Sequence, residues 1–194
     1  MTVEGTGFWR FTNDISMYWL RLQRGTLHLG EGNRIDVMND VLANYNSDAT
    51  LIGGTVHMVI QRFGFYAYGE DFEVVPESML LELAGPYNTI QSDAPLRFHQ
   101  VRFSSATGEG TVNLDQWHQH TDASDFNLLE FRNNGRILDE IEVDSLLFTP
   151  GHVYTLESQR TQTINDHWRI RGNNCGRIQL RSTVPGSLAT TTMA

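Results

Sequence analysis

The stretch that decides the predicted fold is Phe126-Asn127-Leu128-Leu129-Glu130-Phe131-Arg132-Asn133-Asn134-Gly135-Arg136-Ile137-Leu138, in a chain of 194 residues. Aromatic and branched side chains on both sides of Asn133-Asn134-Gly135 are typical of strands. Asn-Gly between two such runs supplies the two residues with positive φ that a type I′ turn requires. The stretch therefore predicts a tight antiparallel hairpin.

Similar short runs continue on both sides of this stretch, and turn residues separate them. They cover residues 7–13, 16–23, 26–29, 50–62, 64–68, 96–104, 111–117, 146–148, 152–158, 163–171 and 177–182. About ten short strands at this spacing are typical of an antiparallel two-layer or closed architecture. We expect a mainly β fold, either a β-sandwich or a domain resembling a jelly roll or barrel.

Two segments in the first half of the chain depart from the strand pattern. Residues 34–45 carry apolar side chains at helical spacing, with Asn33 as a candidate N-cap. Residues 76–84 begin with Pro76, which suits the first turn of a helix, and are followed by Gly85 and Pro86, which suit its end. The sequence predicts a short helix over each segment.

Length and composition predict one domain with an arm. A chain of 22.0 kDa with 40% hydrophobic residues can form a core without disulfides or metal, and its one cysteine, Cys175, excludes an intrachain disulfide. We expect a single β-rich domain over 1–183, with a possible subdivision near the polar loop 86–95. Residues 184–194 lack charge and apolar mass, so they predict a flexible C-terminal arm.

The net charge of −9 is unevenly distributed, and every one of the 14 basic residues is an arginine. Residues 1–159 hold nine arginines against 22 acidic residues, a net −13, whereas residues 160–194 hold five against one, a net +4. The absence of lysine excludes Schiff-base chemistry and a P-loop, and the negative charge disfavours nucleic acid. The basic end either balances local charge or docks on an acidic partner, such as another copy of the chain.

Candidate interface residues follow from this charge and from two tryptophans that adjoin histidines. An exposed ring at Trp117, beside His118, or at Trp168, beside His167, would stack on a sugar. The candidate binding or interface set is Trp117, Trp168, Arg169, Arg171, Arg177 and Arg181.

A candidate metal site lies in Trp117-His118-Gln119-His120-Thr121-Asp122-Ala123-Ser124-Asp125. Residues two apart on a strand share a face, so His118 and His120 could reach one ion, with Asp125 as a carboxylate ligand. The stretch loosely resembles the first motif of the cupin family, which implies a β-barrel holding zinc, iron or manganese. It departs from that motif in having Val112 where cupins have glycine and an aspartate in place of glutamate. The alternative is a polar loop with solvated imidazoles.

A second cluster consists of Asp139, Glu140, Glu142 and Asp144. Alternation places Glu140, Glu142 and Asp144 on one face of a strand. They would either hold calcium or form a solvated face whose like charges prevent edge pairing.

The chain carries no nucleophile elbow and no dinucleotide fingerprint. We therefore expect a non-enzymatic structural or assembly protein without a cofactor, such as a phage capsid decoration, spike or tail subunit. Its partners would be further copies of itself and other structural proteins, not nucleic acid or membrane. The alternatives are a cupin-like metal-dependent enzyme using His118 and His120, and a carbohydrate-binding module that recognises a glycan. No segment resembles a signal peptide, which predicts cytoplasmic synthesis and possible incorporation into a virion.

Overall fold

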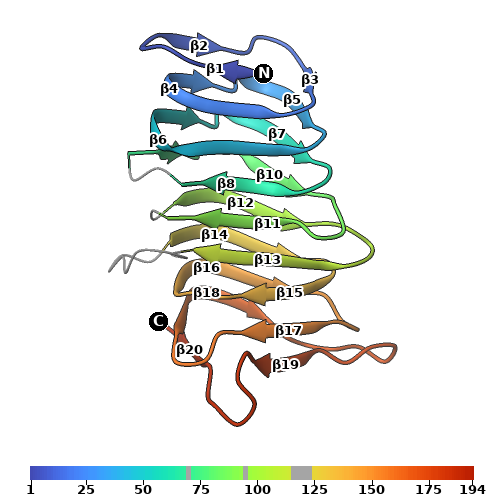
Figure 1. The fold of residues 1–194 in the computed structure, drawn as a ribbon. Coiled ribbons are helices and arrows are strands. Elements are labelled where there is room, and N and C mark those ends of the chain that lie inside the picture. The colour runs from blue at the N-terminus through green and yellow to red at the C-terminus, as the bar shows by residue number, and fades with distance from the viewer. Residues whose placement is uncertain (69–70, 94–95, 115–123) are drawn as a thin grey trace.

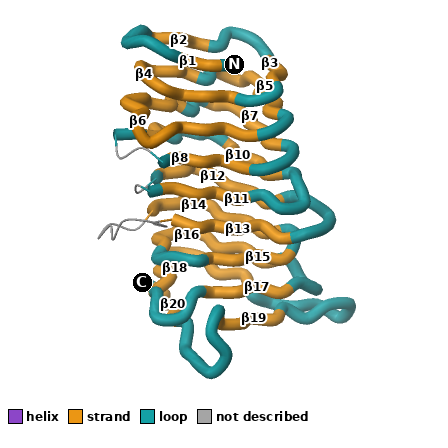
Figure 2. Tube along the Cα trace, in the orientation of Figure 1, coloured by secondary structure: helices purple, strands orange, loops and turns teal. Residues whose placement is uncertain are grey.

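The computed structural model describes residues 1–68, 71–93, 96–114 and 124–194, and every regular element in this part of the chain is a β-strand (Figure 1, Figure 2). The strands wind into a parallel β-solenoid of about seven coils. The N-terminal coils contain β1 (Thr2–Val3), β2 (Phe8–Arg10), β3 (Ile15–Met17), β4 (Leu20–His28), β5 (Glu31–Val37), β6 (Asp40–Ile52), β7 (Thr55–Ile60), β8 (Gly64–Ala67), β9 (Glu73–Val75) and β10 (Leu80–Leu83). The C-terminal coils contain β11 (Thr89–Ser92), β12 (Arg97–Phe103), β13 (Glu109–Leu114), β14 (Ser124–Phe131), β15 (Asn134–Ile137), β16 (Ile141–Phe148), β17 (Val153–Leu156), β18 (Thr161–Arg169), β19 (Gln179–Ser182) and β20 (Thr190–Met193).

Two parallel sheets run the length of the column. The first sheet has the order β1-β4-β6-β8-β11-β13-β15-β17-β19, with β2 also on β4 and β9 also on β6, and the second has the order β20-β18-β16-β14-β12-β10-β7-β5-β3. Successive coils add one strand to each sheet, so neighbouring strands lie about 4.8 Å apart. The column therefore has β1, β2 and β3 at one end and β18, β19 and β20 at the other (Figure 1).

The predicted hairpin is wrong, and the β-sandwich, jelly roll or barrel is wrong with it. Strand β14 pairs with β12 and β16, whereas β15 pairs with β13 and β17 in the other sheet, and all these pairings are parallel. Neither Asn134 nor Gly135 has a positive φ, so a corner of the coil stands where the type I′ turn was expected. Alternation of apolar and polar residues reports only that a strand has one buried face, and it is the same for a parallel and an antiparallel neighbour.

Both predicted helices are wrong as well. Residues 34–45 form the end of β5, a turn at 38–39 and the start of β6. Buried residues alternate with outward-facing ones along each strand, and the turn places Val37 and Val41, both buried, four residues apart. A spacing of four between apolar residues is also typical of a helix, so the sequence pattern resembles one. At 76–84, the amide of Met79 donates to the carbonyl of Pro76 at 2.9 Å to close a turn, and β10 follows.

The core consists of apolar ladders that run from coil to coil. The register of the second sheet aligns Ile15, Ile35, Met58, Leu81, Val101, Leu129, Leu146 and Trp168. The register of the first sheet aligns Leu20, Val41, Phe65, Ile90, Val112, Ile137 and Leu156. Each fully buried side chain of this size contributes roughly 1.5–3 kcal/mol. The ladders therefore hold the coils together and define the inside of the column.

The predicted division into a domain over 1–183, with a possible subdivision near 86–95, and an arm over 184–194 stays a prediction. In the structure, β20 (Thr190–Met193) lies within residues 184–194 and pairs with Thr161–Ile164 of β18. The described residues contain no helix long and apolar enough to cross a membrane.

Candidate functional site

The C-terminal end of the column offers a strand edge that is only half covered. Strand β20 pairs with Thr161–Ile164 of β18, and the amide of Ala194 donates to the carbonyl of Ile164 at 3.1 Å. Beyond Ile164, β18 pairs with β16 on one side, and none of the described strands pairs with its other side. The second half of β18, residues 165–169, is therefore a free parallel edge, and such edges are templates for another strand.

Arginines along the side of the column lie beside carboxylates. The pairs are Arg34–Asp36 at 3.0 Å, Arg97–Asp125 at 3.2 Å, Arg102–Glu130 at 2.8 Å, Arg132–Glu130 at 2.9 Å, Arg136–Glu109 at 3.7 Å and Arg160–Asp139 at 4.0 Å. The charge of these residues is compensated within the protein.

Four arginines of the C-terminal end differ from these. Within the part of the chain that the structure describes, Arg169, Arg171, Arg177 and Arg181 form no ion pair, and all four are exposed. The guanidinium of Arg181 donates only to the side chain of Gln179, at 3.1 Å. Their positive charge is available to an anionic partner.

The four arginines lie on the last strands of the column and in the segment that connects them. Arg169 lies on β18 and Arg181 on β19, at the edges of the two sheets. Between them the chain turns back at Asn173 and Gly176, whose backbones exchange hydrogen bonds of 2.9 and 3.3 Å. A hollow of about 720 Å³ is lined by His167, Trp168, Arg169, Ile170, Arg171 and Gly172. The structure thus brings most of the predicted interface residues to one end of the molecule.

Trp168 closes the core at this end. It continues the ladder that ends with Leu146 in the preceding coil, and its ring packs against the buried cluster. Its indole N–H is buried without a hydrogen-bond acceptor among the described residues. The ring is half-buried and lines the hollow of about 720 Å³, and the glycan site stays a prediction.

Exposed apolar side chains also gather at the two ends of the column. Of the thirteen large apolar residues that are exposed among those described, nine lie in residues 1–19 or 170–193: Met1, Phe8, Tyr18, Trp19, Ile170, Leu180, Val184, Leu188 and Met193. The ends therefore combine free strand edges with apolar surface, which is the composition of a contact region.

The predicted metal site is only partly within the structure. Trp117, His118 and His120 lie outside the described residues, whereas Asp125 lies on β14. Partial burial raises the pKa of Asp125; Arg97 at 3.2 Å opposes this shift, and the charges of Glu142 and Asp144 add to it. The metal-binding set of His118, His120 and Asp125 stays a prediction.

Asp125 faces a hollow of about 320 Å³ on the outer face of the second sheet, which Glu142 and Asp144 also line. Amide groups satisfy these two carboxylates: Asn165 donates to Glu142 at 2.9 Å, and Asn127 donates to Asp144 at 2.9 Å. Asp144 reaches this position because β16 bulges between Val143 and Ser145. The cluster is a polar strand face held by its own hydrogen bonds.

A second cluster, which the sequence reasoning missed, joins His28, Glu31 and Glu77, whose ligand atoms lie within 4.8 Å of one another. The backbone N–H of Gly30 donates to Nδ1 of His28 at 2.8 Å, and Nε2 lies 3.8 Å from Glu31. Neutral His28 therefore carries its proton on Nε2, and a metal-binding histidine needs the opposite arrangement, with the far nitrogen donating. In this tautomer Nε2 has no lone pair for a metal ion, and at 3.8 Å from Glu31 it is too far to donate a hydrogen bond. No sequence spacing signals this cluster, because the solenoid alone brings residue 77 beside residue 28.

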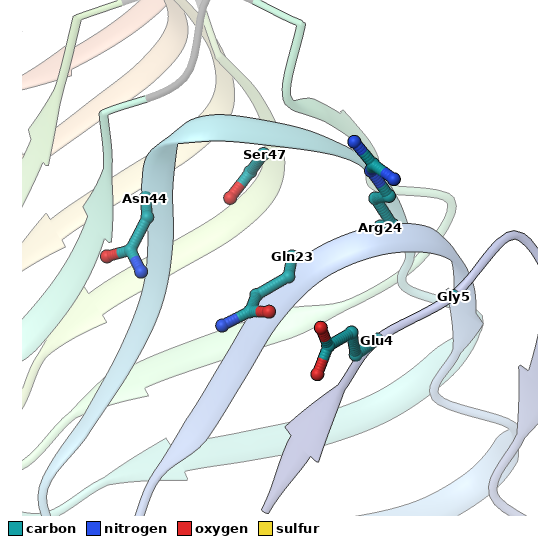
Figure 3. Close-up of a pocket in the computed structure, with 6 residues that line it drawn as sticks. All are labelled: Glu4, Gly5, Gln23, Arg24, Asn44 and Ser47. Atoms are coloured by element: carbon teal, nitrogen blue, oxygen red, sulfur yellow. The ribbon is translucent and has the colours of Figure 1, made fainter.

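A third hollow, of about 510 Å³, lies near the N-terminal end and is lined by Glu4, Gly5, Gln23, Arg24, Asn44 and Ser47 (Figure 3). It opens where the register of β4 and β6 shifts, because β6 places residues 44–47 opposite the single residue Gln23. The hydroxyl of Ser47 donates to the carbonyl of Leu22 at 2.8 Å, so it is not paired with a base. Among the described contacts, Ser47 forms no hydrogen bond with Glu4, the one carboxylate of this hollow, and such a contact is what activates a serine nucleophile.

No family model, curated protein or solved structure matches this chain.

Proposed function

We propose that the chain is a non-enzymatic structural protein, a stiff β-solenoid that joins an assembly through its C-terminal end. The observation that carries the proposal is a set of four arginines at the end of the column that holds the free half of β18: Arg169, Arg171, Arg177 and Arg181 have no carboxylate partner among the described residues. Six arginines along the side of the column, among them Arg34, Arg102 and Arg132, lie beside carboxylates instead.

The fold supports a structural role in two ways. Each coil of a solenoid packs on its neighbours, so a column gains stability with every added coil and tends to require covered ends. The side of this column carries paired charges, such as Arg34 with Asp36 at 3.0 Å and Arg102 with Glu130 at 2.8 Å. The arginines in these pairs are satisfied within the chain, whereas Arg169, Arg171, Arg177 and Arg181 are not paired among the described residues, which favours the C-terminal end as the place of association.

The comparisons give no evidence for the virion or phage role expected from the sequence. We therefore propose a structural protein without naming the particle to which it belongs. The metal-dependent enzyme and the carbohydrate-binding module stay predictions, and no described residue group favours either one.

Sedimentation velocity over a range of protein concentrations tests the proposal. We expect species larger than one chain, which dissociate in high salt because screening weakens contacts between charged groups. The double substitution Arg169→Gln/Arg171→Gln should weaken assembly. Its matched control, Arg62→Gln/Arg136→Gln, removes two arginines from the side of the column and should leave assembly unchanged. A chain that stays monomeric at every concentration and salt contradicts the proposal.

A further inference from the structure

We infer that the partner at the C-terminal end is a second copy of this chain, which adds its β3 to the free half of β18 so that columns stack head to tail. This inference rests on the proposed function, because it specifies what the C-terminal end binds. It follows from register, charge and apolar surface, each of which is a separate observation.

The register of the second sheet is the first observation. Residues Ile15, Ser16 and Met17 of β3 begin the ladders that reach Trp168 and Arg169 in β18 after six intervening strands. A copy placed one coil beyond β18 would set its Ile15 beside Trp168 and its Ser16 beside Arg169. The inward ladder would continue without a change of phase.

Strand β20 covers only the first half of β18, and this leaves room for β3 of a second copy in the same layer. Strand β20 covers Thr161–Ile164, and Ala194 is hydrogen-bonded to Ile164. The incoming β3 would occupy the part of the same coil that begins at Trp168. The two strands would share one layer without overlap, each covering a different half of β18.

Charge is the second observation. In the inferred register, Asp14 precedes Ile15 and lies beside His167, close to Arg169. The N-terminal coil, residues 1–30, holds Glu4 and Asp14 against Arg10, Arg21 and Arg24, so the electrostatic attraction in this contact is local, between Asp14 of one copy and the end of β18 that carries Arg169. A contact between two C-terminal ends would bring eight unpaired arginines together, and like charges disfavour it.

Exposed apolar surface is the third observation. Tyr18 and Trp19 follow β3 and are exposed, and Ile170 follows the free half of β18 and is also exposed. Stacking would cover exposed apolar side chains of both ends, the N-terminal end of one copy and the C-terminal end of the next. Because the surfaces that meet are different, the contact is heterologous and does not close, so it generates a linear chain of columns.

Disulfide trapping tests the register. The natural cysteine, Cys175, is exposed and could form disulfides of its own, so all cysteine variants carry Cys175→Ser. Two proteins are then made, one with Ser16→Cys and one with Arg169→Cys, at two exposed positions. Paired residues of neighbouring parallel strands have Cα atoms about 4.8 Å apart, within the range that a disulfide spans.

We expect a covalent dimer of the two proteins when they are mixed and oxidised, and much less of it when Arg136→Cys replaces Arg169→Cys. Ser16→Arg in the natural background should weaken assembly about tenfold or more, since it faces Arg169. Thr107→Arg adds the same charge at a corner on the side of the column, and it should change assembly less than about twofold.

The outcomes separate the inference from the proposed function. Assembly without the Ser16–Arg169 crosslink overturns the head-to-tail contact and leaves the structural role in place. A dominant crosslink between two Arg169→Cys proteins shows that C-terminal ends meet each other, and it also overturns the inference. A monomeric chain in sedimentation contradicts both.

Discussion

Phe131 and Gly135 are in such close contact that a Cβ atom on Gly135 would lie 2.6 Å from Cδ1 of Phe131. The same relationship occurs one coil earlier, where a Cβ on Gly110 would lie 2.4 Å from Cδ1 of Phe103. Phe103 and Phe131 are neighbours in one sheet and stack with their centroids 4.7 Å apart and an interplanar angle of 5°. Gly110 and Gly135 are neighbours in the other sheet. The phenyl rings therefore lie where the glycines leave room.

Substitution of this glycine should destabilise the column. Gly135→Ala places a methyl group inside the contact distance of a buried ring, and overpacking of this kind costs about 1–3 kcal/mol. The measurement is the midpoint of urea unfolding followed by circular dichroism. Gly7→Ala is the control, because a Cβ there would lie 3.2 Å from the partly exposed ring of Trp9, and we expect a smaller change.

A double-mutant cycle checks that the ring is the cause. Phe131→Leu has its own cost, but in its presence the added methyl group of Gly135→Ala should cost less. A coupling of about 1 kcal/mol in favour of the double variant is expected for residues in contact. Strictly additive effects would show that Gly135 is required for another reason.

The contact between Phe131 and Gly135 also shows why the sequence predicts strands well and their arrangement poorly. Glycine in Asn133-Asn134-Gly135 was interpreted as a turn residue that needs a positive φ. In the structure it lies within β15 and is selected by the ring that approaches it from the opposite sheet. Phe131 and Gly135 are close in sequence, but the reason for glycine is a packing contact, and no local pattern encodes it.

The candidate surface was predictable in composition but not in geometry. The excess of arginine after residue 160 is visible in the sequence and indicates a basic end. That Arg169 and Arg171 lack carboxylate partners follows only from the strand pairing, because the column brings partners such as Arg102 and Glu130 together across a whole coil. The cluster of His28 and Glu77 depends on the same long-range stacking.

Glu130 should make the stability of the column depend on acid. Burial by itself would raise the pKa of Glu130, but hydrogen bonds from Arg132 at 2.9 Å and Arg102 at 2.8 Å outweigh it, and the pKa is lowered. A lowered pKa contributes stability above the unfolded value of about 4.3, and this stability is lost as the pH falls through the folded value. Melting temperatures measured from neutral to acidic pH should fall in that range.

Glu130→Gln tests this assignment. It removes the charge from two charge-assisted hydrogen bonds, so it should cost about 1.5–3 kcal/mol at neutral pH, and its melting temperature should respond less to acid. Glu109→Gln is the control, because the pair that Glu109 forms with Arg136 is longer, at 3.7 Å, and exposed. An acid response as steep in Glu130→Gln as in the natural chain would assign the loss of stability to other carboxylates.

Tyr154 should make the column sensitive to alkali. Its ring stacks on that of Phe148 with centroids 3.9 Å apart, and burial raises its pKa to about 12 despite a hydrogen bond with Thr149 that acts in the opposite direction. Because the folded state favours the neutral phenol, this stability is complete below an unfolded pKa of about 10 and is lost as the pH rises toward 12. A spectroscopic titration should show one phenol that ionises only together with unfolding.

Tyr154→Phe separates the hydroxyl from the ring. The amide of Thr149 donates to this hydroxyl at 2.8 Å, and the hydroxyl donates to the carbonyl of Thr149 at 2.9 Å. Loss of both bonds should cost about 1–2 kcal/mol at neutral pH, and the late ionisation should vanish. Tyr87→Phe, at an exposed position, should change neither property.

Asp125 should destabilise the column at neutral pH even though it forms an ion pair with Arg97. Burial and the neighbouring carboxylates Glu142 and Asp144 raise its pKa, although Arg97 lies 3.2 Å away and opposes them. A raised pKa means that ionised Asp125 is disfavoured in the fold, so its contribution to stability is largest in acid and declines as the pH rises through the folded value. Asp125→Asn should therefore raise the melting temperature slightly at pH 7 and leave it unchanged in acid. Because the side chain is 45% exposed, screening limits the gain to a few tenths of a kcal/mol, about the size of exposed pairs. A lower melting temperature at pH 7 would show that the bond to Arg97 outweighs the repulsion from Glu142 and Asp144.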